Sequence, residues 1–262
     1  MSRIILHVDL NAFFVRCEEI KNPSLINKPV AVGGTGRKGI VSTCSYKARS
    51  YGIHSGMPMF QAQALCKELI ILPCDFKYYN LMSKEFVHHL KQFTPLVEQA
   101  SIDECYIDYT KVKKLYGDEL DFAKRIKKDI KEKFGFTVNV GIGNNKLTAK
   151  MASDFEKPDK IHTLYDYEVE SKMYSLPISD LFGIGKKTTE KLQEMGVKLI
   201  KDLANYDYNS LKKVFKNQAI DMINAAKGIN YDEVESKYII NKGISNEITL
   251  ITDVIDDYVI FE

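Results

Sequence analysis

Short apolar runs alternate with helix-like segments over the first two thirds of the chain. Strands are predicted for the apolar runs at residues 4–8, 29–33, 39–44, 97–100, 104–108 and 137–142. Helices are predicted between them, at residues 12–20, 45–51, 59–66, 78–92 and in a segment that ends at Ala152. An amphipathic helix is indicated by Phe122, Ile126, Ile130 and Phe134, which recur every four residues. This order predicts an α+β fold with an antiparallel sheet and helices on one face.

The pattern changes after residue 164. Residues 167–227 favour short helices joined by polar turns, and residues 228–242 are typical of a linker. Residues 243–262 begin with the alternation of a strand. A chain of 262 residues is long enough for one large domain or two ordinary ones.

Composition narrows the class of protein without deciding its function. The chain is 45% hydrophobic and 27% charged, as soluble globular proteins are. A net charge of +2 neither demands nor excludes a nucleic-acid partner. No apolar stretch reaches the length of a membrane span, and no cleavable signal is visible. The five cysteines lack C-x-x-C spacing, which favours a reduced cytosolic setting without a zinc site or disulfides.

Two acidic segments interrupt the predicted strands about ninety residues apart. Asp9 ends the first apolar run, and Asp103 and Glu104 lie between the runs at 97–100 and 104–108. An unpaired charge is costly in a buried strand, and two neighbouring strands would bring these carboxylates together. Divalent cations such as Mg²⁺ suit such an all-oxygen site, which is typical of two-metal phosphoryl transfer. Taken separately, a cap at Asp9 and a solvent-facing hairpin turn at Asp103 explain the residues equally well.

Motifs extend this pattern in a fixed order along the chain. They are Asp9-Leu10-Asn11-Ala12-Phe13-Phe14 with Glu18, the segments 39–49 and 52–58, Ser101-Ile102-Asp103-Glu104, the segment 140–154, and Leu181-Phe182-Gly183-Ile184-Gly185-Lys186. Together they resemble the motifs of the Y-family translesion DNA polymerases, the ImpB/MucB/SamB group that includes DNA polymerase IV.

The resemblance implies a division of the chain into polymerase domains. Residues 1–10 and 73–165 would form a palm with a ferredoxin-like antiparallel sheet, and residues 11–72 a small α/β fingers insert. Residues 166–232 would form an all-helical thumb with a helix-hairpin-helix motif. Residues 233–262 would hold a linker and the first strand of a truncated little finger, near 243–257.

The resemblance also implies an activity. The protein would be a template-directed DNA polymerase, a nucleotidyltransferase that adds dNTPs to a primer 3′-hydroxyl. Synthesis would be distributive and of low fidelity, and it would serve DNA damage bypass and repair. Two Mg²⁺ ions are expected at the site, and Mn²⁺ is expected to be able to substitute for them. Asp9 and Asp103 would bridge both ions, Glu104 would hold the catalytic ion, and the Leu10 carbonyl would hold the nucleotide-side ion.

Further site residues follow from the same resemblance. The expected nucleotide-binding residues are Phe13, Phe14, Ser42, Thr43, Tyr46, Arg49 and Lys150. Phe14 would be a steric gate against a 2′-hydroxyl, whereas Phe13 is expected to pack inside. Gly183, Gly185 and Lys186 would contact DNA phosphates. Considered alone, Tyr46 and Arg49 also suit an ordinary amphipathic helix, and the Gly-x-Gly turn suits a tight connection.

The chain departs from the family pattern in three places. Asn11 stands where many members have Asp, Phe182 stands where Pro is common, and most of the little finger and a C-terminal clamp-binding peptide are expected to be missing. A catalytic core is therefore expected, with weak and strongly salt-dependent DNA binding.

The expected partners are primer–template DNA and dNTPs. The protein is expected to be a monomer in the bacterial cytosol, without membrane contact, and to associate with the nucleoid when it is bound to DNA. A sliding clamp is expected as a partner only of a full-length form.

Two other functions remain compatible with parts of the pattern. The chain could be a non-catalytic DNA-binding module that relies on the helix-hairpin-helix motif, although three converging acids without metal ions would then cost stability. A palm-type nucleotidyl cyclase would also use a similar sheet and two metals. Its characteristic Gly-Gly-Asp/Glu-Glu-Phe hairpin is absent from the sequence.

Overall fold

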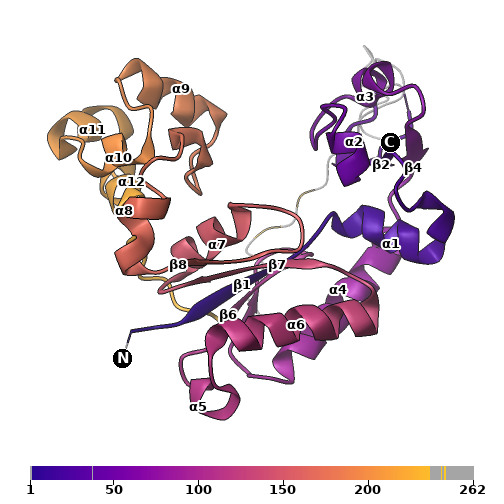
Figure 1. Cartoon of the computed structure of the whole chain (residues 1–262). Coiled ribbons are helices and arrows are strands. Elements are labelled where there is room, and N and C mark those ends of the chain that lie inside the picture. Colours follow the sequence, from indigo (N-terminus) through magenta and orange to yellow (C-terminus); the bar gives the residue numbers. More distant parts are fainter. Residues whose placement is uncertain (1, 37, 237–242, 244, 246–262) are drawn as a thin grey trace.

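A computed structural model of the chain describes residues 2–36, 38–236, 243 and 245 (Figure 1). The strand predicted near 243–257 lies outside these residues, apart from positions 243 and 245. None of the helices within the described ranges is long and apolar enough to cross a membrane.

A five-stranded sheet forms the centre of the molecule. Its strand order is β5 (Val97–Gln99), β6 (Glu104–Asp108), β1 (Ile5–Leu10), β7 (Val138–Gly143) and β8 (Ile161–Leu164). The central strand β1 is antiparallel to both β6 and β7, as predicted. The edge strand β8 was not predicted, and it pairs with β7 in parallel.

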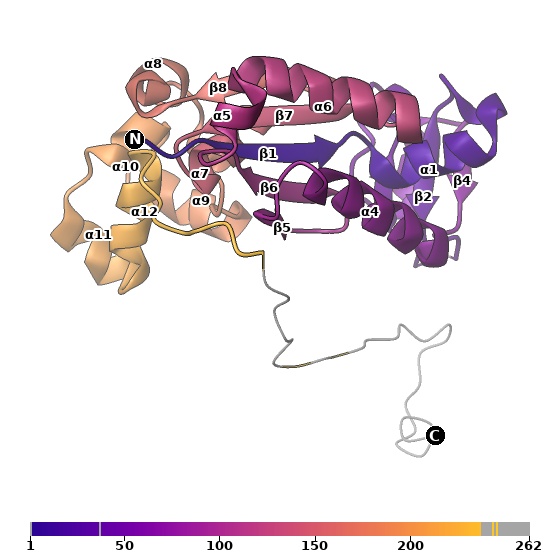
Figure 2. The ribbon, with the colours of Figure 1, turned by 90° about the horizontal axis from the view of Figure 1, so that it is seen from below.

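Two long helices cover one face of this sheet (Figures 1 and 2). They are α4 (Phe76–Lys91) and α6 (Glu119–Phe134), and the short α5 (Lys113–Tyr116) precedes α6. Because successive strand residues face opposite sides, Leu6 and Val8 of β1 pack into the core that these helices share. The Asp118 side chain accepts hydrogen bonds from the start of α6, and Gly135 ends it in a left-handed conformation. The predicted α+β class is confirmed.

A third helix, α7 (Lys146–Asp154), lies against the opposite face, so the sheet has helices on both sides (Figure 1). The sequence pattern predicted helices on one face only. Two glycines of β7 explain the difference, because they let α7 approach the strand closely. A Cβ atom on Gly141 would lie 1.9 Å from the carbonyl oxygen of Ala149, and one on Gly143 would lie 2.3 Å from Thr148 Oγ1.

Residues 11–72 form a small α/β insert beyond the end of β1. Its sheet has the order β3 (Val41–Cys44), β2 (Val30–Gly33) and β4 (Ile70–Leu72). Its helical segments are α1 (Phe13–Lys21), η1 (Pro23–Leu25), α2 (Tyr46–Arg49) and α3 (Met59–Leu65). Ser45 begins α2, since its hydroxyl accepts from Ala48 N and donates to the Lys28 carbonyl. The insert therefore holds α2 in a defined position over the end of the large sheet.

Short helices form a separate unit after β8, as the sequence predicted. They are η2 (Asp166–Glu168), α8 (Val169–Lys172), η3 (Ile178–Asp180), α9 (Lys186–Glu194), α10 (Ile200–Ala204), α11 (Tyr208–Phe215) and α12 (Gln218–Ala226). This unit shares one apolar core with α7. In Figure 1 the helical unit and the insert stand at opposite ends of the sheet, on the side that α7 covers.

Candidate active site

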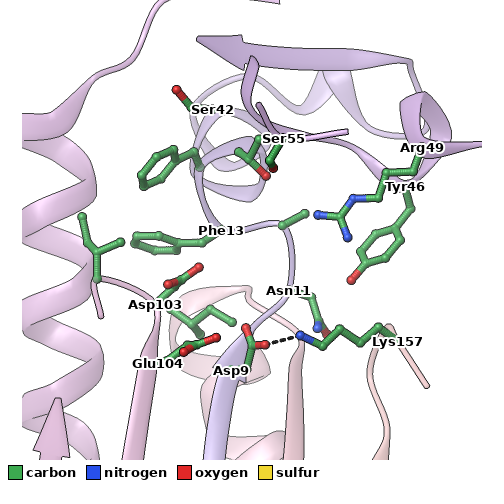
Figure 3. A pocket seen from close by; sticks show the side chains of 15 residues that line it. Asp9, Asn11, Phe13, Ser42, Tyr46, Arg49, Ser55, Asp103, Glu104 and Lys157 are labelled. Atoms are coloured by element: carbon green, nitrogen blue, oxygen red, sulfur yellow. Dashed lines mark hydrogen bonds and ion pairs between the residues drawn. The ribbon is translucent and has the colours of Figure 1, made fainter. Parts of the chain in front are cut away.

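A cavity of about 370 Å³ lies where the insert meets the ends of β1 and β6 (Figure 3). Most of the site residues predicted from the sequence come together in it. The predicted residues that line it are Asp9, Leu10, Phe13, Phe14, Ser42, Thr43, Tyr46, Arg49, Asp103 and Glu104. It is also lined by Asn11, Ala12, Ser55, Ile102 and Lys157, none of which was predicted as a site residue. Lys150, which was predicted, does not line it.

Strand register brings the acidic residues together. Asp9 of β1 is the direct cross-strand partner of Glu104 on β6, and both face away from the main core. The preceding residue, Asp103, is tied to the same place because its carbonyl accepts a 3.0 Å hydrogen bond from Leu10 N. The apolar runs around these carboxylates form the strands, and the strands place three acids at one edge of the cavity.

Asp103 lacks a cationic partner at the described positions. Ser101 donates a 2.6 Å hydrogen bond to Asp103 Oδ1. Burial raises the pKa of the Asp103 carboxyl despite this hydrogen bond, and the neighbouring charges of Asp9 and Glu104 raise it further. A cation in the cavity would therefore stabilise the ionised form of Asp103.

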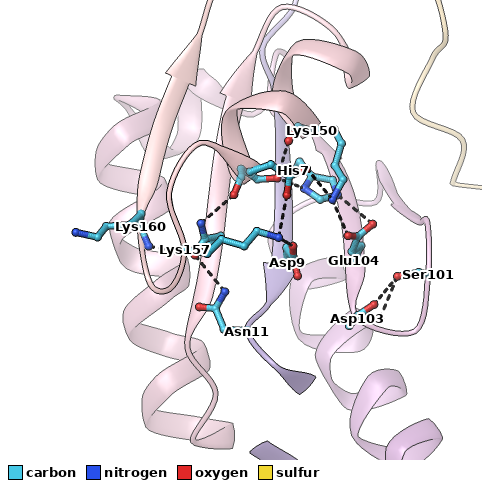
Figure 4. A network of polar contacts seen from close by, with 12 residues as sticks. His7, Asp9, Asn11, Ser101, Asp103, Glu104, Lys150, Lys157 and Lys160 are labelled. Atoms are coloured by element: carbon cyan, nitrogen blue, oxygen red, sulfur yellow. Dashed lines mark hydrogen bonds and ion pairs between the residues drawn. The ribbon is translucent and has the colours of Figure 1, made fainter. Parts of the chain in front are cut away.

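Glu104, in contrast, is held in its charged form (Figure 4). Lys150 Nζ donates to Glu104 Oε1 at 2.7 Å, and His7 Nε2 lies 3.6 Å from Oε2. Burial alone would raise the pKa of Glu104, but His7 and Lys150 outweigh it and lower that pKa to about 2. The fully buried His7 is itself fixed by a 2.8 Å hydrogen bond between its Nδ1 and the Ser153 hydroxyl.

Lys157 makes the corresponding contact with Asp9. Its ammonium donates to Asp9 Oδ2, and it lies 2.8 Å from Asp154. Burial favours a neutral lysine, but the charges of Asp9 and Asp154 outweigh it and raise the pKa of Lys157. The only sequence signal for this residue is its place three positions after Asp154 and just before Pro158, beyond the motif that suggested Lys150.

The opposite wall of the cavity comes from α2. Tyr46 and Arg49 share one face of this helix, and the Arg49 guanidinium lies over the Tyr46 ring at 4.6 Å. Burial raises the pKa of the Tyr46 hydroxyl, so it remains a proton donor. Figure 3 shows both polar ends pointing into the cavity, with Lys157 across from them. These three donors suit an anion with several oxygens.

The two phenylalanines of the first motif have different environments. Phe13 is 2% exposed and packs in the core 5.5 Å from the Phe136 ring, as expected. Phe14 is less buried and stacks on Tyr79, with ring centroids 4.4 Å apart and ring planes at 12°. The Tyr79 hydroxyl donates to Glu18 at 2.6 Å, which fixes the ring beneath Phe14. Phe14 is thus held as a rigid apolar wall of the cavity.

The carboxylates are the right ligands for a hard divalent cation. Asp9, Asp103, Glu104 and the Leu10 carbonyl offer only oxygen donors, which Mg²⁺ prefers. Among the described residues, no three acidic, histidine or cysteine side chains are close enough in their present orientations to hold one ion. The reason is visible in the ion pairs, since Asp9 faces Lys157 and Glu104 faces Lys150. The residues therefore fit the ion by chemistry once these two carboxylates turn from their lysines.

The predicted DNA-contact residues lie in the helical unit. Gly183 and Gly185 form the turn before α9, which starts at Lys186. Gly183 has a φ of +89°, so glycine suits this turn. Gly183 and Phe182 also line a second cavity of about 700 Å³, which reaches across to Glu104 and Tyr106 of the sheet. Glu104 therefore lines both cavities, and the second cavity extends from it to the hairpin turn.

Comparison with known proteins agrees with the motifs. The family model described as impB/mucB/samB family matches residues 8–154, and the IMS family HHH motif matches residues 167–197. DNA polymerase IV of Clostridium acetobutylicum is 42% identical over 98% of this chain and 66% of its own length. DNA polymerase IV 1 of Bacillus subtilis is 40% identical over 98% of this chain and 62% of its own length. The chain thus spans just under two thirds of the length of these relatives.

Solved structures show the same architecture. The crystal structure of DinB from Sulfolobus solfataricus superposes with a TM-score of 0.81 and 32% identity, over 89% of this chain and 69% of that one. An insertion ternary complex of Dbh DNA polymerase gives the same TM-score and identity over 88% and 69% of the two chains. Since the first family model covers more than half of the chain, the protein belongs to the impB/mucB/samB family, the Y-family group that its motifs resemble.

Proposed function

We propose that this chain contains the catalytic part of a template-directed DNA polymerase, which adds a dNTP to a primer 3′-hydroxyl. The observation that carries the proposal is the single cavity shared by Asp9, Asp103 and Glu104 with the anion-binding pair Tyr46 and Arg49. Phosphoryl transfer needs both parts, because charge develops on the phosphate while the nucleophile must be activated. The names of the relatives, DNA polymerase IV, support the same activity.

Asp9, Asp103, Glu104 and the Leu10 carbonyl would hold two Mg²⁺ ions. When bound, such ions lower the pKa of a hydroxyl nucleophile and neutralise charge on the reacting phosphate. The protein's own residues keep these metal ligands charged and oriented. Lys150 and His7 keep Glu104 ionised, and Ser101 orients the Asp103 carboxylate. Asp9, which now contacts Lys157, would be a ligand of the cation.

Tyr46, Arg49 and Lys157 would bind the triphosphate. Arginine provides a planar fork for phosphate oxygens, tyrosine a neutral donor and lysine a point charge. The sequence suggested Lys150 for this last role, but Lys150 contacts Glu104 and does not line the cavity. We therefore assign the lysine contact with the triphosphate to Lys157. Ser42 and Thr43 line the same wall and would lie beside the incoming nucleotide.

Phe14 would select the sugar. Its ring borders the cavity and is supported from behind by Tyr79, so it has no room to retreat from a 2′-hydroxyl. The site should therefore prefer dNTPs over rNTPs. The small side chains of Ser42 and Ser55 on the insert side leave space around the base pair, which favours low fidelity and synthesis past damaged bases.

Primer–template DNA would occupy the second, larger cavity. That cavity begins at Glu104, where the primer end must lie, and runs to Phe182 and Gly183 of the hairpin. Backbone N–H groups at Gly183 and Gly185, with the charge of Lys186, would contact a DNA phosphate without reading its sequence. In this assignment the central sheet is the palm, the insert is the fingers and the helical unit is the thumb.

Primer extension tests the proposal. The chain should extend a labelled primer on a DNA template when Mg²⁺ and dNTPs are present, and Asp103→Asn should not, because it keeps the size of the side chain but removes its charge. Both proteins should bind the primed DNA equally well in a gel-shift assay. Binding without extension by the unchanged protein, at low salt and high enzyme concentration, would support the non-catalytic DNA-binding alternative.

A further inference from the structure

Asn11 replaces the Asp that is common in the first motif, and the structure gives its amide a specific partner. Asn11 Nδ2 donates to Asn139 Oδ1 at 3.1 Å, and the two side chains are 4% and 0% exposed. Asn11 Oδ1 accepts a 2.9 Å hydrogen bond from Asp159 N. A carboxylate at position 11 could keep the second bond but not the first, since it has no hydrogen to donate.

Asn139 cannot turn to suit a different partner. Its Nδ2 group donates to the carbonyls of Ser153, at 2.8 Å, and Glu156, at 2.6 Å. Its Oδ1 accepts from Lys160 N at 3.3 Å as well as from Asn11. Because both hydrogens of this amide point at carbonyls, its oxygen must face Asn11.

Three of these hydrogen bonds reach the segment 155–160, between α7 and β8. The backbone of Glu156, Asp159 and Lys160 is bound by the two amides, and Lys157 lies in the middle of that stretch. Lys157 is also the only residue of the segment that lines the nucleotide cavity. Asn139 does not line it, so Asn139 acts on a bound nucleotide through this segment or through its partner Asn11, which does line the cavity.

We propose that Asn11 and Asn139 form an amide pair that positions Lys157 at the nucleotide triphosphate. The inference rests on the proposed function, since Lys157 is assigned there to the triphosphate. Both asparagines are positioning residues in this role, because Asn139 holds the backbone on both sides of Lys157 and Asn11 holds it at Asp159. The Asn at position 11 is then a matched partner of Asn139 rather than a weakened metal ligand.

The test uses Asn139→Ser, which removes both amide donors without changing the charge. Titration of the protein with dATP and Mg²⁺ should show a dissociation constant about tenfold higher, as expected when one charged contact is misplaced. Hydrogen exchange at the Asp159 and Lys160 amides should speed up. As a control, Ile130→Ala removes core volume on the far face of the sheet, and it should lower the melting temperature without changing dATP affinity.

A double-mutant cycle separates positioning from general damage. If Asn139 acts through Lys157, Asn139→Ser should have no further effect on dATP affinity in a Lys157→Ala background. An equal loss in both backgrounds, or unchanged dATP affinity in Asn139→Ser, would overturn the inference. Failure of the unchanged protein to bind dATP would count against the proposed function instead. Hydrogen exchange would then still decide the role of the pair, because Asn139→Ser removes the acceptor of the Lys160 amide and should free it whether or not dATP binds.

Discussion

Lys150 lies against Glu104, with its Nζ 2.7 Å from Oε1, and both side chains are largely buried. The contact makes Lys150 the counterion of a carboxylate that the proposed reaction requires. Lys157, seven positions later, makes the equivalent contact with Asp9 and also lines the cavity. The two lysines therefore have different expected effects when they are removed.

Lys150→Met should mainly lower stability, by about 3 kcal/mol, because it removes the lysine counterion of the largely buried Glu104 and leaves only His7 beside it. Lys157→Met should also lower stability, because Asp9 loses its ion pair, and it should in addition raise KM for the dNTP by about tenfold or more, because it removes a phosphate contact. Urea unfolding and steady-state single-nucleotide insertion, measured on both variants, check this division. The reverse pattern, with KM raised by Lys150→Met alone, would restore the role that the sequence suggested for Lys150.

Glu104 should make stability depend on pH in the acid range. Its pKa is lowered from 4.5 to about 2 in the folded protein. The folded state therefore releases this proton more readily than the unfolded state. The resulting stability is fully present above pH 4.5 and is lost as pH falls towards 2. Measured by urea unfolding between pH 2.5 and 6, the free energy of unfolding should fall more steeply with decreasing pH in the unchanged protein than in Glu104→Gln. Parallel plots of this free energy against pH would contradict the prediction.

Asp103 should behave in the opposite sense. Burial and its acidic neighbours raise the pKa of Asp103 above 3.8 in the folded protein. Its contribution to stability is thus present below pH 3.8 and is lost as pH rises through the folded pKa. At pH 7 without Mg²⁺, Asp103→Asn should melt higher than the unchanged protein while losing primer extension. A lower melting temperature would mean that the Asp103 carboxylate is already compensated by a contact in the folded chain.

The sequence predicted the acidic site well for a simple physical reason. Asp9 and Glu104 end or begin apolar runs, and the register of neighbouring strands turns that pattern into proximity. Phe13 packs in the core as expected, although it also borders the cavity, and Phe14 is less buried and borders the same cavity.

Features that depend on packing across the molecule were missed. Lys157 reaches the cavity from a segment that Asn11 and Asn139 bind across the molecule, and no periodicity records that. The position of α7 on the second face depends on Gly141, whose role appears only when the helix is in place. The edge strand Ile161–Leu164 is mostly half-buried, so it lacked the apolar run that marked the central strands.

Phe13→Ala and Phe14→Ala form a matched pair on adjacent residues. Phe13→Ala should cost about 3–5 kcal/mol of stability, because it empties a core position beside Phe136. Phe14→Ala should cost less and should allow rNTP insertion, because it opens the cavity where the sugar lies. The ratio of kcat/KM values for dATP and ATP, together with urea unfolding, checks both. An unchanged sugar preference in Phe14→Ala would remove the gate from the proposed mechanism.

Lys186→Ala with Lys187→Ala should weaken DNA binding through phosphates alone. Both lysines start α9, directly after the Gly183 turn that borders the large cleft. Each lost phosphate contact should reduce the slope of log K against log salt by about 0.9, so the double variant should lose up to about 2 units of slope. Because such contacts read no sequence, the loss should be equal for templates of different composition.

Lys124→Ala, on the exposed face of α6 and paired with Asp121, is the matched control and should leave the slope unchanged. Fluorescence anisotropy with a primed template between 20 and 200 mM salt gives the slopes. An unaltered slope in the double variant would mean that the hairpin does not contact DNA.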